Sequence, residues 1–276
     1  MTSPDEGRAL RTAAALEPLG PGRYSVNLSP AYTVMGHPHG GYLQCVMGGG
    51  ALAGASDEGA AHRDVTAIAT NYVHSPSVGP GEVRTEVRRV GRGASFVHVT
   101  LFQNELLVCE SLATLGTLHE GAALRYQNAE VPTIAPIEEC RKSTGSDELD
   151  IMSIVDQRLD PVSAGWRTGE FSTDAEVRGW LRLDDGEASW NAWSLLFASD
   201  ALPPATFPIG SSGWVPTLQL TTYVRRIPTS EWLRARQWAV VIAEGLVDER
   251  LELFDESDEL VASSSQLAMV RFPEGR

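Results

Sequence analysis

The residue that first suggests chemistry is Asp200, a carboxylate at the end of the apolar stretch "WSLLFAS". The pattern predicts a helix here, and a carboxylate at the end of so apolar a helix must be capped, hydrogen-bonded or functional. Its place near the helix C-terminus is also unfavourable for a negative charge. In a functional role, Asp200 would orient or deprotonate a water molecule. In a purely structural role, it would only mark the turn into "ALPP".

Two further polar residues, Thr217 and Gln266, lie in predicted strands. Thr217 follows Pro216 directly, and threonine is common in strands whether or not it has a role. Gln266 follows three serines, and alternation places it on one strand face with Ala268 and Val270, a predicted core face. A glutamine among core residues needs partners for its amide, which Asp200, Thr217 or an ordered water could supply.

These residues depend on a mixture of strands and two helical segments. The stretch "HPHGGYLQCVMGGGALAGA" (residues 37–55) has helical spacing in spite of its glycines, and residues 187–205 form a second helix candidate that Pro203 and Pro204 break. Alternating segments after each candidate predict antiparallel strands, with turns at "GRG" and "QNE" in the first half. Both halves therefore have the order strand, helix, meander.

Short sequence matches support an internal repeat. The segment 70–73 matches 221–224 at an offset of 221 − 70 = 151, and 101–102 matches 253–254 at 253 − 101 = 152. A third match, 105–106 with 259–260, has an offset of 259 − 105 = 154. An antiparallel sheet with one long helix per half packs best when the sheet curls around the helix, and glycines then allow close approach.

The repeat distinguishes a specialised site from general packing. The local offsets pair the three polar residues with these positions of the N-terminal half: Asp200 with Gly49 (200 − 151), Thr217 with Thr66 (217 − 151) and Gln266 with Leu112 (266 − 154). The N-terminal half therefore has neither the acid nor the amide. A set needed only for packing should occur in both halves, so this asymmetry favours a site in the C-terminal half.

The chain resembles the type II (TesB-like) acyl-CoA thioesterases from about residue 24 to 271. The motifs that carry the resemblance are "HPHGGYL" (37–43), "GRGASFVHVTL" (91–101), "ASDALPP" (198–204), "VPTLQLTTYVRRIP" (215–228) and "LVASSSQLAMVR" (260–271). The resemblance implies an α+β double hotdog, in which two tandem hotdog repeats each wrap an antiparallel sheet around a central helix. It also implies that Asp200, Thr217 and Gln266 hold and activate the hydrolytic water.

Hydrolysis of a thioester also needs donors for the oxyanion that forms on the carbonyl oxygen. No GxSxG elbow is present, so we expect no serine nucleophile. Unpaired backbone N–H groups at a helix start are suitable donors, and Gly40 and Gly41 lie at such a start; we assign the role to Gly41 in particular. Gly48, Gly49 and Gly50 are expected to bring the helix close to its sheet.

Binding of coenzyme A would need positive charge for its phosphates. We select Arg89, Arg92 and Arg225 from the two basic stretches around residues 84–92 and 225–226, although solvated strand faces explain such arginines equally well. His39 is interpreted as a loop histidine before the helix. The spacing of His37, His74 and His98 is not that of metal ligands, so we expect no metal, and no cofactor besides the CoA of the substrate.

Composition limits the remaining function classes. The net charge of −14 over 276 residues argues against generic binding to nucleic acid or to anionic membranes. We find no apolar run of membrane-spanning length and no secretion signal in the first twenty residues, and the three cysteines (Cys45, Cys109 and Cys140) form no cluster. We therefore expect a reduced, cytoplasmic protein in which Cys45 and Cys109 are buried thiols.

The sequence thus predicts an acyl-CoA thioesterase with an N-terminal repeat (1–120), a proline- and acid-rich linker with one short helical piece (121–168) and a catalytic C-terminal repeat (169–276). Two alternatives stay open, a hotdog enoyl-CoA hydratase or dehydratase and a non-catalytic acyl-CoA-binding protein. Pairing into a homo-oligomer, a dimer or higher, is also open. The aromatic residues of the C-terminal half could shape an acyl tunnel or only pack the core.

Overall fold

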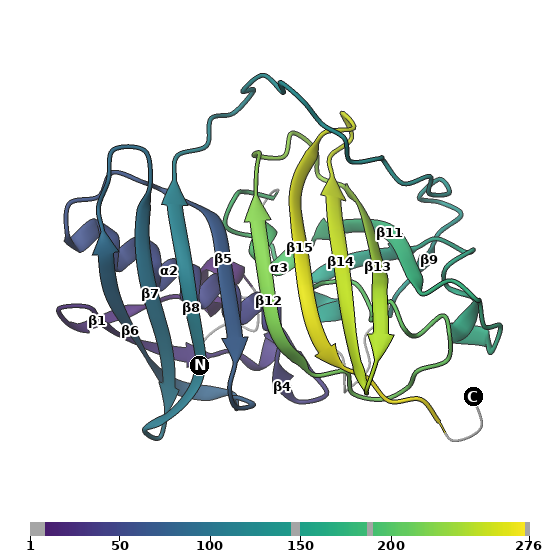
Figure 1. The fold of residues 1–276 in the computed structure, drawn as a ribbon, viewed down its shortest axis with the longest axis horizontal. Helices are drawn as coiled ribbons and strands as arrows, with labels where there is room; N and C mark the ends of the chain where they lie inside the picture. The colour runs from purple at the N-terminus through teal and green to yellow at the C-terminus, as the bar shows by residue number, and fades with distance from the viewer. Residues whose placement is uncertain (1–8, 145–149, 187–189, 274–276) are drawn as a thin grey trace.

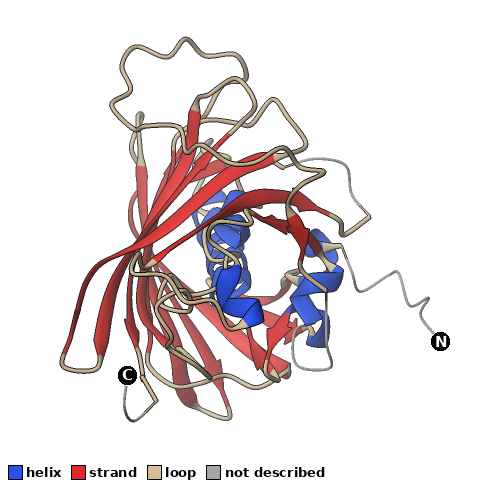
Figure 2. Ribbon diagram, turned by 90° about the vertical axis from the view of Figure 1, so that its right-hand side faces the viewer, coloured by secondary structure: helices blue, strands red, loops and turns tan. Residues whose placement is uncertain are grey.

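A thirteen-stranded antiparallel sheet curves around the helices in the computed structural model, which describes residues 9–144, 150–186 and 190–273. Figure 2 shows the helices on one side of this sheet. The first half contains α1 (Leu10–Ala13), β1 (Glu17–Gly20), β2 (Arg23–Leu28), a 3₁₀ turn (Pro30–Tyr32), β3 (Thr33–Val34), β4 (His37–Pro38), α2 (Gly40–Asp57), β5 (Asp64–Tyr72), β6 (Gly79–Arg89), β7 (Ser95–Gln103) and β8 (Leu106–Gly116). The second contains β9 (Arg141–Lys142), 3₁₀ turns at Asp150–Ser153 and Gly165–Thr168, β10 (Val155–Leu159), β11 (Glu176–Leu183), α3 (Leu195–Ala198), β12 (Thr217–Val224), β13 (Leu233–Ala243), β14 (Leu246–Phe254) and β15 (Leu260–Met269).

The strand order is nearly a palindrome. The first half contributes β1-β2-β6-β7-β8-β5, and the second continues with β12-β15-β14-β13-β11-β10-β9. The halves join where β5 pairs with β12 in an antiparallel ladder from Gln219↔Asn71 to Tyr223↔Ala67, at the centre of Figure 1. The buried side chain of Gln44 crosses this seam: it donates to the Leu220 carbonyl (3.0 Å) and accepts from the Thr222 hydroxyl (2.7 Å).

The glycine-rich helix is present as predicted, and α2 begins at Gly40 and ends at Asp57. Most of its residues are buried because it lies against the inner faces of β5 to β8. A helix that is apolar all round is expected in such an enclosed position. Tertiary packing therefore compensates for the low helix propensity of the glycines.

The second central helix is much shorter than predicted. Of residues 187–205, 187–189 lie outside the described residues, and α3 covers only Leu195–Ala198. Upstream, the Asn191 side chain accepts from the N–H groups of Trp193 and Ser194 (both 2.9 Å), which fixes a turn in place of another helical turn. Downstream, Pro203 and Pro204 cannot continue a helix. The segment 199–216 is irregular in consequence.

The predicted linker contains part of the sheet. Residues 117–140 have neither helix nor strand and pass from β8 to β9 along the upper edge in Figure 1. The rest of the segment then forms β9 and β10, and β10 pairs with β11 from Val155↔Leu183 to Leu159↔Gly179. The 121–168 segment is therefore a connection followed by the last two strands at one end of the sheet, which its proline and acid content concealed.

Two of the three repeat offsets deduced from the sequence, 151 and 154, are wrong by one residue, whereas the offset of 152 between the fully buried Leu101 and Leu253 agrees with the structure. Thr70 and Thr222 are both fully buried on the inner face, which gives an offset of 222 − 70 = 152, whereas 151 would place inner side chains on the outer face. The offset of 152 pairs Asp200 with Gly48 in place of Gly49 (200 − 152). Leu220 pairs with Gln266 as Ile68 pairs with Ala113, so Gln266 corresponds to Ala113 and not to the exposed Leu112.

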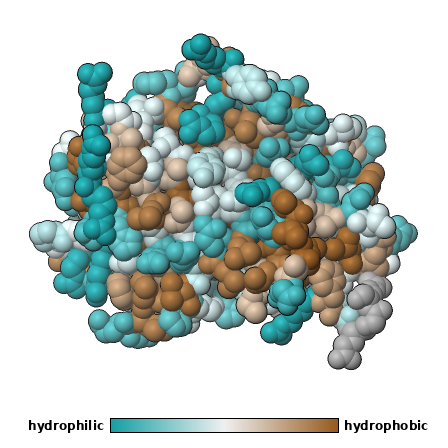
Figure 3. All heavy atoms as spheres, viewed as in Figure 1, coloured by the Kyte–Doolittle hydropathy of each residue, from teal (hydrophilic) through white to brown (hydrophobic). Residues whose placement is uncertain are grey.

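The outer face of the sheet is partly apolar. Exposed apolar side chains on β12 to β15 include Tyr223, Val240, Val241, Leu267 and Met269, and Figure 3 shows apolar surface gathered over this half. All three cysteines are unpaired and buried, as predicted for Cys45 and Cys109. In the part of the chain that the structure describes, no helix is both long and apolar enough to cross a membrane.

Candidate active site

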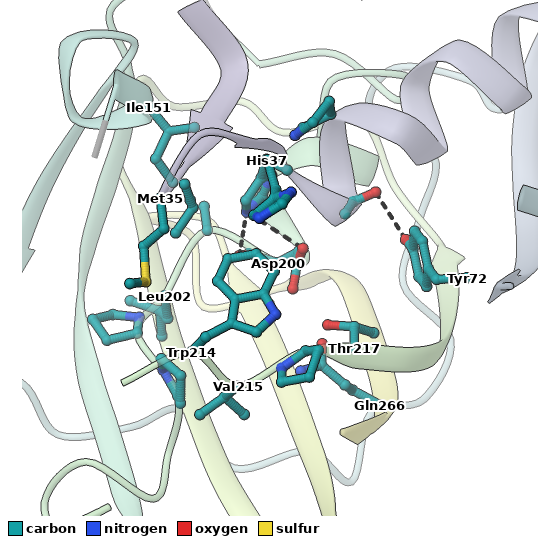
Figure 4. A pocket seen from close by; sticks show the side chains of 18 of the residues that line it. Met35, His37, Tyr72, Ile151, Asp200, Leu202, Trp214, Val215, Thr217 and Gln266 are labelled. Atoms are coloured by element: carbon teal, nitrogen blue, oxygen red, sulfur yellow. Dashed lines mark hydrogen bonds and ion pairs between the residues drawn. The ribbon is translucent and has the colours of Figure 1, made fainter. Parts of the chain in front are cut away.

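A cavity of about 520 Å³ opens beside the start of α2 and brings together residues from both halves. Asp200, two residues after α3, lines it together with Thr217, the first residue of β12, and Gln266 in the middle of β15. Figure 4 shows Thr217 and Gln266 side by side, with the Asp200 carboxylate nearby. The volume lies within the usual range for small-molecule sites.

The carboxylate of Asp200 meets the N-terminus of α2. Its Oδ2 accepts from the N–H of Gly41 (2.9 Å) and lies 3.3 Å from Nε2 of His39, and the side chain is only 14% exposed. Burial raises the pKa of Asp200, while His39 and the Gly41 N–H oppose that rise. The start of α2 therefore compensates for the unfavourable position of Asp200 after its own helix, because a helix N-terminus stabilises negative charge.

His39 contributes more than its sequence position suggests. It lies directly before α2, as predicted, and its Nδ1 accepts from the N–H of Tyr42 (3.4 Å) as the helix cap. Its Nε2 therefore carries the proton and donates to the Asp200 backbone carbonyl (2.8 Å). The imidazole is buried against the ring of Phe197 (5.2 Å between centroids). His39 and Asp200 are 161 positions apart, and the sequence contained one signal for their contact, the position of His39 directly before the two glycines.

The two glycines at the start of α2 differ in what their N–H groups do. The N–H of Gly41 is engaged by Asp200, whereas for Gly40 no acceptor is recorded among the described residues. A Cβ on Gly40 would lie 2.6 Å from Asp200 Oδ2, and one on Gly41 would lie 2.7 Å from the Phe197 carbonyl oxygen. The hydroxyl of Tyr72 donates to the Gly40 carbonyl (2.8 Å; Figure 4) and fixes the first turn. The Gly41 N–H, to which the sequence assigned the oxyanion role, is thus already engaged by Asp200.

Thr217 and Gln266 complete this end of the cavity. The structure records no protein partner for the Thr217 hydroxyl in the residues it describes. The Gln266 side chain shares the inner face with the buried Ala268 and Val270, as predicted. Its Nε2 donates to Oε2 of Glu249 (3.4 Å). The sequence suggested Asp200 and Thr217 as partners of this amide and gave no indication of Glu249.

The wider lining is mainly apolar, with one guanidinium. Phe207 and Trp214 of the C-terminal half line the cavity, together with Tyr72 of β5 and Trp166 of the 121–168 segment. Arg167 also lines it, and donates to the Ser143 hydroxyl (3.0 Å). The arginines selected for CoA binding lie outside the lining: Arg89 at the end of β6, Arg92 in the following turn and Arg225 after β12.

Comparison with known proteins gives a consistent result. Residues 28–116 match the model of an acyl-CoA thioesterase N-terminal domain, and residues 135–270 match that of an acyl-CoA thioesterase C-terminal domain. A Thermobifida fusca protein described as a thioesterase II is 31% identical, with a TM-score of 0.86 over 95% of this chain and 97% of the other.

Two further crystal structures share the fold at lower identity. A hot dog fold protein of unknown function from Alicyclobacillus acidocaldarius has a TM-score of 0.82 at 20% identity, over 96% of this chain and 98% of the other. The acyl-CoA thioesterase II TesB2 of Mycobacterium marinum has a TM-score of 0.71 at 19% identity, over 97% and 99%. The curved sheet is thus a hotdog fold.

Proposed function

The chain belongs to the TesB-like acyl-CoA thioesterase family and is a thioester hydrolase, and we propose that it cleaves acyl-CoA to a free carboxylic acid and CoA in the cavity around Asp200. The observation that carries the proposal is the convergence of a buried carboxylate, a hydroxyl and an amide on one cavity at the start of α2. Sequence asymmetry between the halves also supports it, since the positions equivalent to Asp200 and Gln266 are Gly48 and Ala113.

Asp200, Thr217 and Gln266 are proposed to hold the attacking water. Asp200 accepts one proton of the water as general base, and its raised pKa brings its basicity closer to what such a base needs near neutral pH. Thr217 and Gln266 restrict the orientation of the same water. The water oxygen attacks the thioester carbonyl carbon, the C–S bond breaks, and the proton taken by Asp200 passes to the departing CoA thiolate.

The oxyanion is proposed to form against the start of α2. The Gly40 N–H is available and adjacent to Asp200, and the helix dipole favours negative charge there. In this arrangement the Gly41 N–H positions Asp200, and His39 supports the same carboxylate. One helix N-terminus then serves both the base and the oxyanion.

The remaining aspects of the proposal concern organisation. We infer a double hotdog, with one unit in residues 1–120 and the other in 169–276, to whose edge the 121–168 segment adds β9 and β10. The palindromic strand order supports this.

Apolar surface on β12 to β15 supports pairing into a homo-oligomer. The proposal includes a cytoplasmic location, a role in fatty acid metabolism and no cofactor beyond the substrate's CoA, whose phosphates would contact Arg167 or the sequence-selected Arg89, Arg92 and Arg225.

The decisive experiment measures CoA release from short, medium, long and aryl acyl-CoAs. We expect turnover by the wild type and a fall in kcat of about 10²–10⁴-fold for Asp200→Asn, the usual contribution of a general base. Asp248→Asn is the matched control, because that carboxylate lies on β14 beside Arg250 and away from the cavity. Unchanged turnover in Asp200→Asn would remove Asp200 from the mechanism. Enoyl-CoA hydration, or CoA binding without hydrolysis, would replace the proposed reaction.

A further inference from the structure

A buried carboxylate lies directly behind the wall of the cavity. Glu249 on β14 is 1% exposed. Its Oε1 accepts from the backbone N–H of Ala205 (2.9 Å), and its Oε2 accepts from the side-chain amides of Gln237 (2.9 Å) and Gln266 (3.4 Å). One carboxylate thus links the loop after Asp200, strand β13 and strand β15. Both glutamines line the cavity.

The fold itself does not require this polar pair. Glu249 pairs with Gln266 across β14 and β15 as Val97 pairs with Ala113 across β7 and β8. The offsets are 249 − 97 = 152 and 266 − 113 = 153, close to that of the buried threonines. Val97 and Ala113 are both buried, so apolar side chains fill these inner-face positions in the other half.

The surroundings make the charge on Glu249 costly. The groups that face it from β13, β15 and the 199–216 loop are two neutral amides and a backbone N–H, and Asp200 acts on it as a like charge. On its own strand, Asp248 and Arg250 form a pair with each other. Burial therefore raises the pKa of Glu249 to about 7. A buried acid is costly, and the equivalent position in the first half holds the apolar Val97. The presence of an acid behind the cavity therefore indicates a function.

We propose that Glu249 is a positioning residue, whose carboxylate turns the side-chain amide of Gln266 so that the amide oxygen faces the cavity. This rests on the proposed hydrolysis at Asp200. An ionised carboxylate can only accept hydrogen bonds, so the amides that reach it must present their NH₂ groups. The Oε1 of Gln266 is then directed away from Glu249.

This orientation determines what Gln266 offers to the attacking water. With its amide oxygen in the cavity, Gln266 accepts a hydrogen bond from one hydrogen of the water while Asp200 accepts from the other. A lone pair of the water oxygen is then left to point at the thioester carbon. A protonated Glu249 has an O–H donor and no longer requires an NH₂ group. The side-chain amide of Gln266 can then turn over and present its NH₂ group to the water, and this misorients the water. Turnover therefore depends on the ionisation of Glu249.

The variant Glu249→Gln tests this with little change in shape. Its Oε1 can still accept from Ala205, but its NH₂ group faces Gln266 and requires the amide oxygen there, so Gln266 presents NH₂ to the cavity. We expect kcat to fall by about 10- to 100-fold with KM within about twofold of wild type, since misplacement of a group by about 1 Å costs up to about 10². The component of the pH–kcat profile that titrates near pH 7 should disappear.

The matched control is Glu252→Gln. Glu252 lies on the same strand and burial raises its pKa too, but Arg236 acts on it and it does not line the cavity. We expect wild-type kcat and an unchanged pH profile. A wild-type kcat and pH profile for Glu249→Gln would overturn the proposal, and so would an equal fall in both variants.

A second readout does not depend on activity. The ¹H–¹⁵N signals of the Gln266 side-chain amide, identified by their absence from Gln266→Leu, should shift with an apparent pKa near 7 in the wild type and stay constant in Glu249→Gln. If no acyl-CoA is hydrolysed, the proposed function fails, and this titration still decides whether Glu249 controls the amide. Signals that do not titrate in the wild type would refute that control.

Discussion

Replacing Gly40 by alanine tests whether close approach of α2 to Asp200 sets the reaction geometry. The added Cβ would lie 2.6 Å from Asp200 Oδ2 and 3.2 Å from the Tyr72 hydroxyl oxygen. Ordinary contacts begin at 3.4 Å, so the carboxylate would have to move by about 3.4 − 2.6 = 0.8 Å. The helix backbone is held by its sheet contacts, so the Asp200 side chain is the group that yields.

The expected consequence is a fall in kcat on the order of 100-fold, because a shift of about 1 Å in a reacting group costs about that factor. The effect on stability should be small. Alanine gains up to about 1 kcal/mol of helix propensity over glycine, and the crowding at the carboxylate offsets it by an amount in the usual range of about 1–3 kcal/mol. Activity and stability should therefore separate.

The control for this prediction is Gly49→Ala in the same helix. Its Cβ would lie 3.8 Å from Leu16 and 4.0 Å from Trp193, which is ordinary contact. We expect unchanged kcat and a free energy of unfolding higher by up to about 1 kcal/mol. Release of CoA thiol and urea unfolding measure the two quantities. Wild-type kcat in Gly40→Ala, with Gly49→Ala behaving as expected, would refute the reasoning.

Four further outcomes are expected. Activity should fall as the pH drops through the raised pKa of Asp200, since a protonated carboxyl cannot take a proton from water, and a pH–kcat profile without such an acid limb would contradict this. The pKa of Glu249 lies above its unfolded value of 4.5, so the unfolded chain loses this proton at lower pH than the folded chain does. The free energy of unfolding should therefore fall by about 3 kcal/mol relative to Glu249→Gln as the pH rises from 4.5 through about 7, as measured by urea unfolding. Gln44→Leu should lower the free energy of unfolding by about 3 kcal/mol, because buried polar groups at the seam lose their partners. Arg167→Ala should raise KM for acyl-CoA about tenfold through loss of a charge-assisted contact, and an equal rise in Arg225→Ala would instead support the arginine selected from sequence.

Strong local patterns made much of the fold predictable. Alternation between polar and apolar residues indicated the meander strands, and α2 was predicted in spite of its glycines, although its eighteen residues are apolar on all sides and not on one face. The second helix was not, since its apolar content suggested length while the Asn191 side chain and the two prolines limited it to one turn. The repeat offset failed by one residue because a tetrapeptide match carries no information about which face of a strand is buried.

The site was predictable only where a motif placed a residue. The positions of Asp200, Thr217 and Gln266 followed from motifs, and they line one cavity, although their roles stay predictions. Contacts made through space were not predictable. Glu249 lies in an unremarkable strand sequence, and its meaning depends on the cross-strand register that sets it beside Gln266.

The shortened helix explains why the cavity lies where it does. In the first half, α2 fills the space inside the sheet along eighteen residues. In the second half, α3 has four, and the irregular segment 199–216 that follows lines the cavity with Leu202, Phe207, Trp214 and Val215. The start of α2 contacts Asp200 at the edge of this cavity, so the first half positions the proposed base of the second half. The two similar halves thus contribute different parts of the proposed site: the second half supplies Asp200, Thr217 and Gln266, and the first half supplies the helix N-terminus that meets Asp200.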